Sequence, residues 1–165
     1  MARKTAYLGL FCAAALILSY IESLIPFFAG IPGMKLGLPN AAIVTVLYLY
    51  SWREAGLVNL ARILAVGFLF GNAFSVAFSA AGAALSLLCM QLLKRTDRFS
   101  PLGVSIAGGV AHNAGQVMVA AAVVENVRIG YIFLPLAIAG VVTGGVIGVI
   151  AGILIPRLVP LSKNS

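Results

Sequence analysis

Long apolar segments separated by short clusters of charged residues dominate the chain. Charge-free stretches cover residues 5–21, 36–52, 63–93, 99–124 and 129–156. A helix needs roughly 20 apolar residues to span a bilayer. The stretch 63–93 is too long for one such helix, and the turn signal Gly71-Asn72 lies near its middle. The pattern therefore predicts six transmembrane helices, at about residues 5–28, 37–51, 54–70, 73–93, 102–124 and 131–155.

The composition excludes most other classes of protein. Of the 165 residues, 62% are apolar and 9% are charged, and the mean hydropathy is +1.10. A soluble domain has about 25% charged and 45–50% apolar residues, so a soluble globular domain, a disordered chain and a fibrous repeat are all excluded. We expect an all-α integral membrane protein, with residues 1–165 forming a single six-helix domain.

The distribution of basic residues predicts how the helices are oriented. If the N-terminus is cytoplasmic, the basic residues on the cytoplasmic side are Arg3, Lys4, Arg53, Lys94, Arg95, Arg98, Arg157 and Lys163, and those outside are Lys35 and Arg128. This excess follows the positive-inside rule, so both termini are expected in the cytoplasm. The net charge of +7 comes from scattered residues, which does not favour nucleic-acid binding.

A cleaved signal peptide over residues 1–23 is the alternative for the first segment, because Arg3 and Lys4 precede an apolar run. That run is longer than usual for a signal peptide. Its removal would leave five spans and would place the termini on opposite sides of the membrane. We therefore keep the first segment as a transmembrane helix.

Small residues recur at helical spacing in several predicted helices. They are Gly140, Gly144, Gly148 and Gly152 in the last, Ser75, Ser79 and Ala83 in the fourth, and Gly9 and Ala13 in the first. On a helix this spacing makes a smooth groove that a neighbouring backbone can approach closely. Two interpretations remain open: packing inside a compact bundle, or docking of a partner subunit, for which the first helix is the candidate.

Ionisable side chains inside the predicted helices are few, and each is costly in a bilayer. They are Glu22, Arg62 and His112, with the amides Asn59, Asn113 and Gln116 nearby. We expect a polar pocket that opens outward, in which Arg62 receives an anionic group and Glu22 a cationic or hydrogen-bonding group. The alternative is structural: a buried Glu22–Arg62 pair and a satisfied histidine that lock the bundle.

The predicted outer loops add candidate residues to this pocket. Residues 30–40 are too apolar and too rich in glycine and proline for an ordinary solvated loop. Irregular backbone at membrane depth persists only where it is buried in protein or lines a cavity, so residues 32–40 are expected to form a re-entrant lid. The loops contribute Lys35, Asn40 and Asn72 as candidate substrate-binding residues.

The chain lacks the motifs of an autonomous enzyme. It has one aspartate, Asp97, whereas a prenyltransferase needs clustered aspartates to hold magnesium against a diphosphate. It has no Gly-x-x-x-x-Gly-Lys-Ser/Thr loop for a nucleotide. We expect no catalytic residue, metal or cofactor, and energy for any transport would come from a partner or a gradient.

Several segments resemble one bacterial membrane family closely. The similar segments are Pro32–Asn40, Asn59–Arg62, Gly71-Asn72 and Gly103–Asn113. The family is labelled either heptaprenyl diphosphate synthase component I or Gx transporter. The resemblance implies a multi-pass protein of the bacterial cytoplasmic membrane.

The six-span layout with short loops also resembles the substrate-binding S components of energy-coupling factor (ECF) vitamin transporters. That resemblance implies capture of a small molecule, such as a vitamin or cofactor precursor, from outside. It also implies partners, namely a transmembrane coupling protein that would contact Gly9 and Ala13 and a pair of ABC-type ATPases. The alternative function is that of a non-catalytic membrane component associated with heptaprenyl diphosphate or menaquinone biosynthesis.

Overall fold

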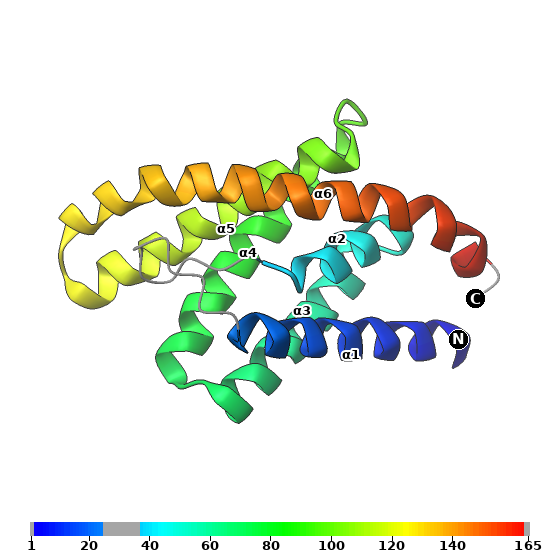
Figure 1. Cartoon of the computed structure of the whole chain (residues 1–165), viewed down its shortest axis with the longest axis horizontal. Coiled ribbons are helices and arrows are strands. Elements are labelled where there is room, and N and C mark those ends of the chain that lie inside the picture. Colours follow the sequence, from blue (N-terminus) through cyan, green and yellow to red (C-terminus); the bar gives the residue numbers. More distant parts are fainter. Residues whose placement is uncertain (1, 25–36, 164–165) are drawn as a thin grey trace.

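The computed structural model describes residues 2–24 and 37–163, and this part of the chain consists of helices joined by short connections (Figure 1). The expectation of an all-α protein is confirmed, and the helices fall close to the predicted positions. They are α1 (Ala2–Leu24), α2 (Asn40–Leu49), α3 (Trp52–Phe70), α4 (Ala73–Arg95), α5 (Pro101–Val124), the short 3-10 helix η1 (Val127–Ile132) and α6 (Phe133–Lys163).

The turn predicted at Gly71-Asn72 does divide the long apolar stretch into two helices. Asn72 is the N-cap of α4, and its side chain accepts a hydrogen bond from the Ser75 N–H at 2.8 Å. The Ser75 hydroxyl in turn accepts from the Asn72 N–H at 2.9 Å. This reciprocal capping box satisfies two backbone donors at the helix start and fixes the point at which α4 begins.

Two helices differ most from the predictions, and the predicted end of the first helix near residue 28 lies outside the described residues. The helix expected over 37–51 spans only Asn40–Leu49, because Gly37 has a φ of +72° and its carbonyl accepts from the Asn40 N–H in a turn. The last helix continues to Lys163 rather than ending near residue 155, with Pro156 and Pro160 inside it. Proline is tolerated in membrane helices where the freed backbone groups find other partners.

In the part of the chain that the structure describes, four helical segments are long and apolar enough to cross a membrane: Arg3–Leu24, Ala73–Arg95, Pro101–Val124 and Val127–Pro160. α2 has 10 residues, and at 1.5 Å per residue it covers about half of the ~30 Å hydrocarbon thickness. α3 carries Arg53, Glu54 and Arg62 and is not among the four. The chain is therefore a helical membrane protein, with fewer clear spans than the six expected.

α2 lies at the centre of the apolar core. Residues 41–47 are all buried, including Ile43, Val44 and Leu47. The other helices surround this segment with buried side chains, which are Val58 of α3, Met90 of α4, Val104 of α5 and Ile147 and Ala151 of α6. A helix that is apolar on all sides is suited to such an enclosed position.

The glycine strip of α6 packs against α5. A Cβ atom at Gly144 would lie 2.7 Å from the Ser105 carbonyl oxygen, and one at Gly148 would lie 2.8 Å from the Leu102 Cα. The Ser105 hydroxyl also donates to the Gly144 carbonyl at 2.8 Å. For Gly140, Gly144 and Gly148 the interpretation as packing within the bundle is therefore confirmed, whereas Gly152 has nothing within 4 Å of its Cβ position.

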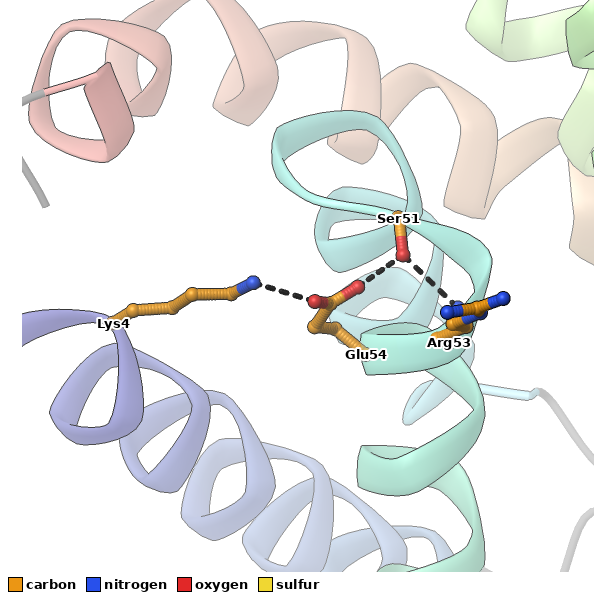
Figure 2. Close-up of polar contacts among 4 residues, drawn as sticks. All are labelled: Lys4, Ser51, Arg53 and Glu54. Atoms are coloured by element: carbon orange, nitrogen blue, oxygen red, sulfur yellow. Dashed lines mark hydrogen bonds and ion pairs between the residues drawn. The ribbon is translucent and has the colours of Figure 1, made fainter. Parts of the chain in front are cut away.

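An ion pair joins the starts of α1 and α3. The Lys4 ammonium donates to Glu54 at 2.5 Å, and Glu54 also accepts from the Ser51 hydroxyl, as Figure 2 shows. Ser51 is the N-cap of α3 and accepts from the Arg53 N–H at 3.2 Å. The start of α1 and the end of α6 lie at this same end of the molecule (Figure 1).

We predict that replacing Gly144 by alanine destabilises the protein, because the added methyl group must displace the backbone of α5. Overpacking of this kind costs about 1–3 kcal/mol, so the thermal midpoint in detergent should fall by several degrees. Gly145→Ala is the matched control, since nothing lies within 4 Å of its Cβ position. Equal losses in the two variants would contradict the close contact between α5 and α6.

Candidate functional site

A polar cavity of about 210 Å³ lies between α1, α3, α4, α5 and α6, next to the turn that precedes α2. It lies toward the end of α1, the end of α3 and the start of α4, away from the Lys4–Glu54 ion pair. Its polar lining residues are Ser19, Glu22, Ser23, Asn40, Arg62, Ser75, Ser79, His112, Asn113, Gln116 and Thr143. Such a group of polar side chains within an apolar helical bundle is a candidate binding site.

Arg62 contributes a permanent positive charge from the middle of α3. Its Nε and Nη2 atoms donate to the Asn59 side-chain oxygen at 3.2 and 2.8 Å, and its Nη1 donates to the Ser19 hydroxyl at 3.4 Å. The Ser19 hydroxyl donates to the Ala15 carbonyl at 2.8 Å, so its oxygen is oriented to accept. Asn59 and Ser19 therefore hold the guanidinium at the cavity wall.

Glu22 contributes a carboxylate from the last turn of α1. It accepts a hydrogen bond from the Gly37 N–H at 2.5 Å, which ties α1 to the turn before α2. Both Glu22 and Arg62 line the cavity. The structure thus brings Glu22 and Arg62 to the wall of one cavity, whereas their direct pairing, the alternative interpretation, stays a prediction.

α5 places His112 and Gln116 on its face toward α4. A Cβ atom at Gly82 of α4 would lie 2.9 Å from the His112 Cε1 and 3.0 Å from the Gln116 Cγ. The absence of a side chain at Gly82 therefore lets these two larger groups fit between the helices. Asn113 faces α6 instead, where its amide donates to the Leu136 carbonyl at 2.6 Å.

Six of the nine candidate substrate-binding residues line this single cavity: Glu22, Asn40, Arg62, His112, Asn113 and Gln116. Asn59 does not line the cavity. Its side-chain oxygen accepts a hydrogen bond from Arg62, and only 5% of its surface is exposed. Asn72 belongs to the capping box of α4 and does not line the cavity. Lys35 lies outside the described residues.

The expected lid over residues 32–40 is described only from residue 37 onward. In that part, Gly37, Pro39 and Asn40 line the cavity. Gly37 adopts a left-handed conformation, and a Cβ there would lie 3.2 Å from the Asn40 amide nitrogen. The backbone at this wall is therefore irregular and adjoins a polar cavity, the setting in which non-helical backbone is tolerated at membrane depth.

Hydroxyl groups are the lining residues that the sequence analysis missed. Ser19 and Ser23 flank Glu22 on α1, and Thr143 lies in the glycine-rich part of α6. Ser75 and Ser79 had been interpreted only as small packing residues. The spacing of three between Ser19 and Glu22 places both on one helix face, and this signal was available in the sequence.

The lining provides one guanidinium, one carboxylate, an imidazole, amides and hydroxyls. These groups can bind a small polar molecule by ionic and hydrogen bonds. Among the described residues, no group of three or more His, Cys, Asp or Glu side chains is arranged to hold a metal ion.

We predict that Asn59→Leu destabilises the protein, because the Nε side of the Arg62 guanidinium then loses its acceptor. Leaving a buried polar group unsatisfied costs about 1–3 kcal/mol, which thermal unfolding in detergent would detect. Asn59→Asp retains an oxygen acceptor and should recover most of the loss. A stable Asn59→Leu variant, or an Asn59→Asp variant no better than it, would show that Asn59 does not support Arg62.

Comparison with known proteins identifies a family for most of the helical domain. The model of the family described as heptaprenyl diphosphate synthase component I matches residues 11–154. Comparisons with curated proteins and with solved structures found no match. The matched segment covers most of the chain and includes every described residue that lines the cavity. The protein therefore belongs to the heptaprenyl diphosphate synthase component I family, as its sequence motifs had indicated.

Proposed function

We propose that the protein is a membrane substrate-binding subunit, similar to an S component, which captures a small polar molecule for uptake. The observation that carries this proposal is the cavity of about 210 Å³, in which Glu22 and Arg62 meet amide and hydroxyl side chains from five helices. Ionisable groups inside a membrane domain commonly mark a substrate path. The subunit has no catalytic role of its own in this proposal.

The six helices lie in the membrane of a bacterial cell with both termini in the cytoplasm, and α2 is a short enclosed helix among them. Two contacts support this orientation. Lys4 of α1 pairs with Glu54 at the start of α3, and Lys94 of α4 donates to the Leu47 carbonyl at the end of α2 at 2.5 Å. These basic residues thus gather at one end, as the positive-inside rule requires.

The cavity then opens toward the outer side of the membrane. Arg62 receives an anionic group of the substrate, and Glu22 receives a cationic or hydrogen-bonding group. Residues 32–40 gate the site, with Gly37 and Asn40 at its wall. His112, Asn113 and Gln116 of α5 supply hydrogen bonds on the opposite wall.

Energy for uptake comes from partner proteins, a transmembrane coupling protein and ABC-type ATPases. Gly9 and Ala13 are exposed on α1, and nothing lies within 4 Å of a Cβ position at Gly9. A smooth strip of this kind permits close approach of a partner helix. It is therefore the proposed docking face for the coupling protein.

A second candidate function rests on the printed name of the family, component I of a heptaprenyl diphosphate synthase. In that role the protein would be a non-catalytic membrane component that associates with a prenyl diphosphate synthase subunit. The cavity would then be a lipid or structural site. The partners of the protein distinguish the two functions.

We predict that gentle purification of the tagged protein from native membranes yields ABC-type ATPases and a second membrane protein, identified by mass spectrometry. Gly9→Leu should lose these partners, because the larger side chain blocks the docking strip. Gly152→Leu is the matched control and should keep them, since its Cβ position on α6 is equally open. Recovery of a prenyl diphosphate synthase subunit in place of ATPases would favour the second candidate.

A further inference from the structure

The hydrogen-bond acceptors that Arg62 meets among the described residues are neutral groups. The guanidinium donates two N–H groups to the side-chain oxygen of Asn59 and one to the hydroxyl of Ser19. A guanidinium has five N–H groups, so one N–H remains on each terminal nitrogen. Two N–H groups of this planar fork are what bidentate binding of a carboxylate needs.

Beside Arg62, the wall that α3 contributes to the cavity is apolar. The polar side chains stand at separate positions on a surface that is apolar over its greater part. Ile63, Val66 and Phe70 of α3 all line the cavity. The spacing of four from Arg62 to Val66 and from Val66 to Phe70 places these three on one helix face. A molecule whose anionic group lies at Arg62 therefore meets apolar side chains along the next two turns of α3.

The charges at the cavity limit a bound anion to a single negative charge. Of the described residues that line the cavity, Arg62 is the one with a permanent positive charge. The carboxylate of Glu22 lines the same cavity and would repel a second negative charge. A phosphate monoester carries about −1.5 to −2 at neutral pH, whereas a carboxylate carries one charge. A monocarboxylate therefore suits this site better than a phosphate or a diphosphate.

The size of the cavity limits the apolar part of the molecule. Arg62 and Phe70 are eight residues apart, which is about 12 Å along a helix at 1.5 Å per residue. The volume of about 210 Å³ is below the roughly 300–1,000 Å³ of pockets that hold drug-sized ligands. One ring or a short alkyl chain fits these dimensions, and a heptaprenyl chain of seven isoprene units does not.

We infer that the cavity binds a compact monocarboxylate with an apolar body, whose carboxylate is held by Arg62 and whose body lies against Val66 and Phe70. This inference rests on the proposed function, because it names the class of molecule that the binding subunit captures. It adds that the captured molecule is charged at one end and apolar at the other.

The test uses the purified full-length protein in nanodiscs and a panel of simple probes. The acids are phenylacetate, 3-phenylpropanoate, 4-phenylbutanoate and hexanoate, which vary the length and shape of the apolar body. Each acid is matched by its primary amide, which has the same body and no charge. Acetate tests a carboxylate without a body, and phenyl phosphate tests a second negative charge. Binding is measured by calorimetry up to millimolar concentrations, and empty nanodiscs give the signal from partition into lipid.

We expect at least one of the four acids to bind at least tenfold more tightly than its amide, than acetate and than phenyl phosphate. In Arg62→Gln the preference for the acid over the amide should disappear, because the bidentate donor is lost. If this variant fails to fold, the ratio of acid to amide in the wild-type protein decides the matter.

The apolar wall is tested by a matched pair of variants on α3. Phe70 lines the cavity and is 58% exposed, whereas Phe68 does not line it and is 91% exposed. Phe70→Ala should weaken binding of the preferred acid at least threefold and leave binding of acetate unchanged. Phe68→Ala should bind the acid as the wild-type protein does.

Four outcomes would overturn the inference: an amide or acetate that binds as tightly as the best acid, phenyl phosphate that binds more tightly than every acid, equal affinities in Phe70→Ala and Phe68→Ala, or no binding by any of the four acids. None of these outcomes removes ATPases from the purified complex. Loss of the proposed function is therefore recognised separately, by a purified complex that lacks them.

Discussion

A permanent charge inside an apolar helical bundle must be satisfied by its neighbours, and the arrangement around Arg62 follows from this requirement. The guanidinium donates to Asn59 on its own helix and to Ser19 of α1, and Glu22 lines the same cavity. Glu22 is in turn tied to the Gly37 N–H in the turn before α2. One costly side chain thus organises α1, α3 and the wall formed by the turn, and the polar cavity lies where they meet.

The other side of the cavity depends on close helix packing rather than on charge. Gly144 and Gly148 let α6 approach the backbone of α5, and Gly82 leaves room for His112 and Gln116 between α4 and α5. Small residues allow helix backbones to approach closely, and the resulting van der Waals contact drives helix association in lipid. A tightly packed α4–α6 unit therefore faces the charged wall of α1 and α3, and a bound molecule would contact both.

The hydrophobic pattern predicted the helices well, because length and charge spacing decide where helices lie in a bilayer. The split at Gly71-Asn72 and the meeting of Glu22, Arg62 and His112 in one cavity both followed from the sequence. The short length of α2 could not be predicted from the sequence. It depends on Gly37 adopting a left-handed conformation in the turn before the helix, and the hydrophobic pattern does not reveal this conformation. The roles of Asn59 and Asn72 were also missed, because an amide that supports an arginine or caps a helix looks the same in sequence as one that binds a ligand.

The most direct test of this account is whether water reaches the cavity from outside the cell. In a variant in which serines replace Cys12 and Cys89, Ser79→Cys places a thiol at the cavity wall, and Ser86→Cys places one two turns along α4 at a site that is 6% exposed. A membrane-impermeant thiol reagent added to intact cells should label the first and not the second. Equal labelling of both, or labelling of Ser79→Cys only from the cytoplasmic side, would contradict an outward-opening polar cavity.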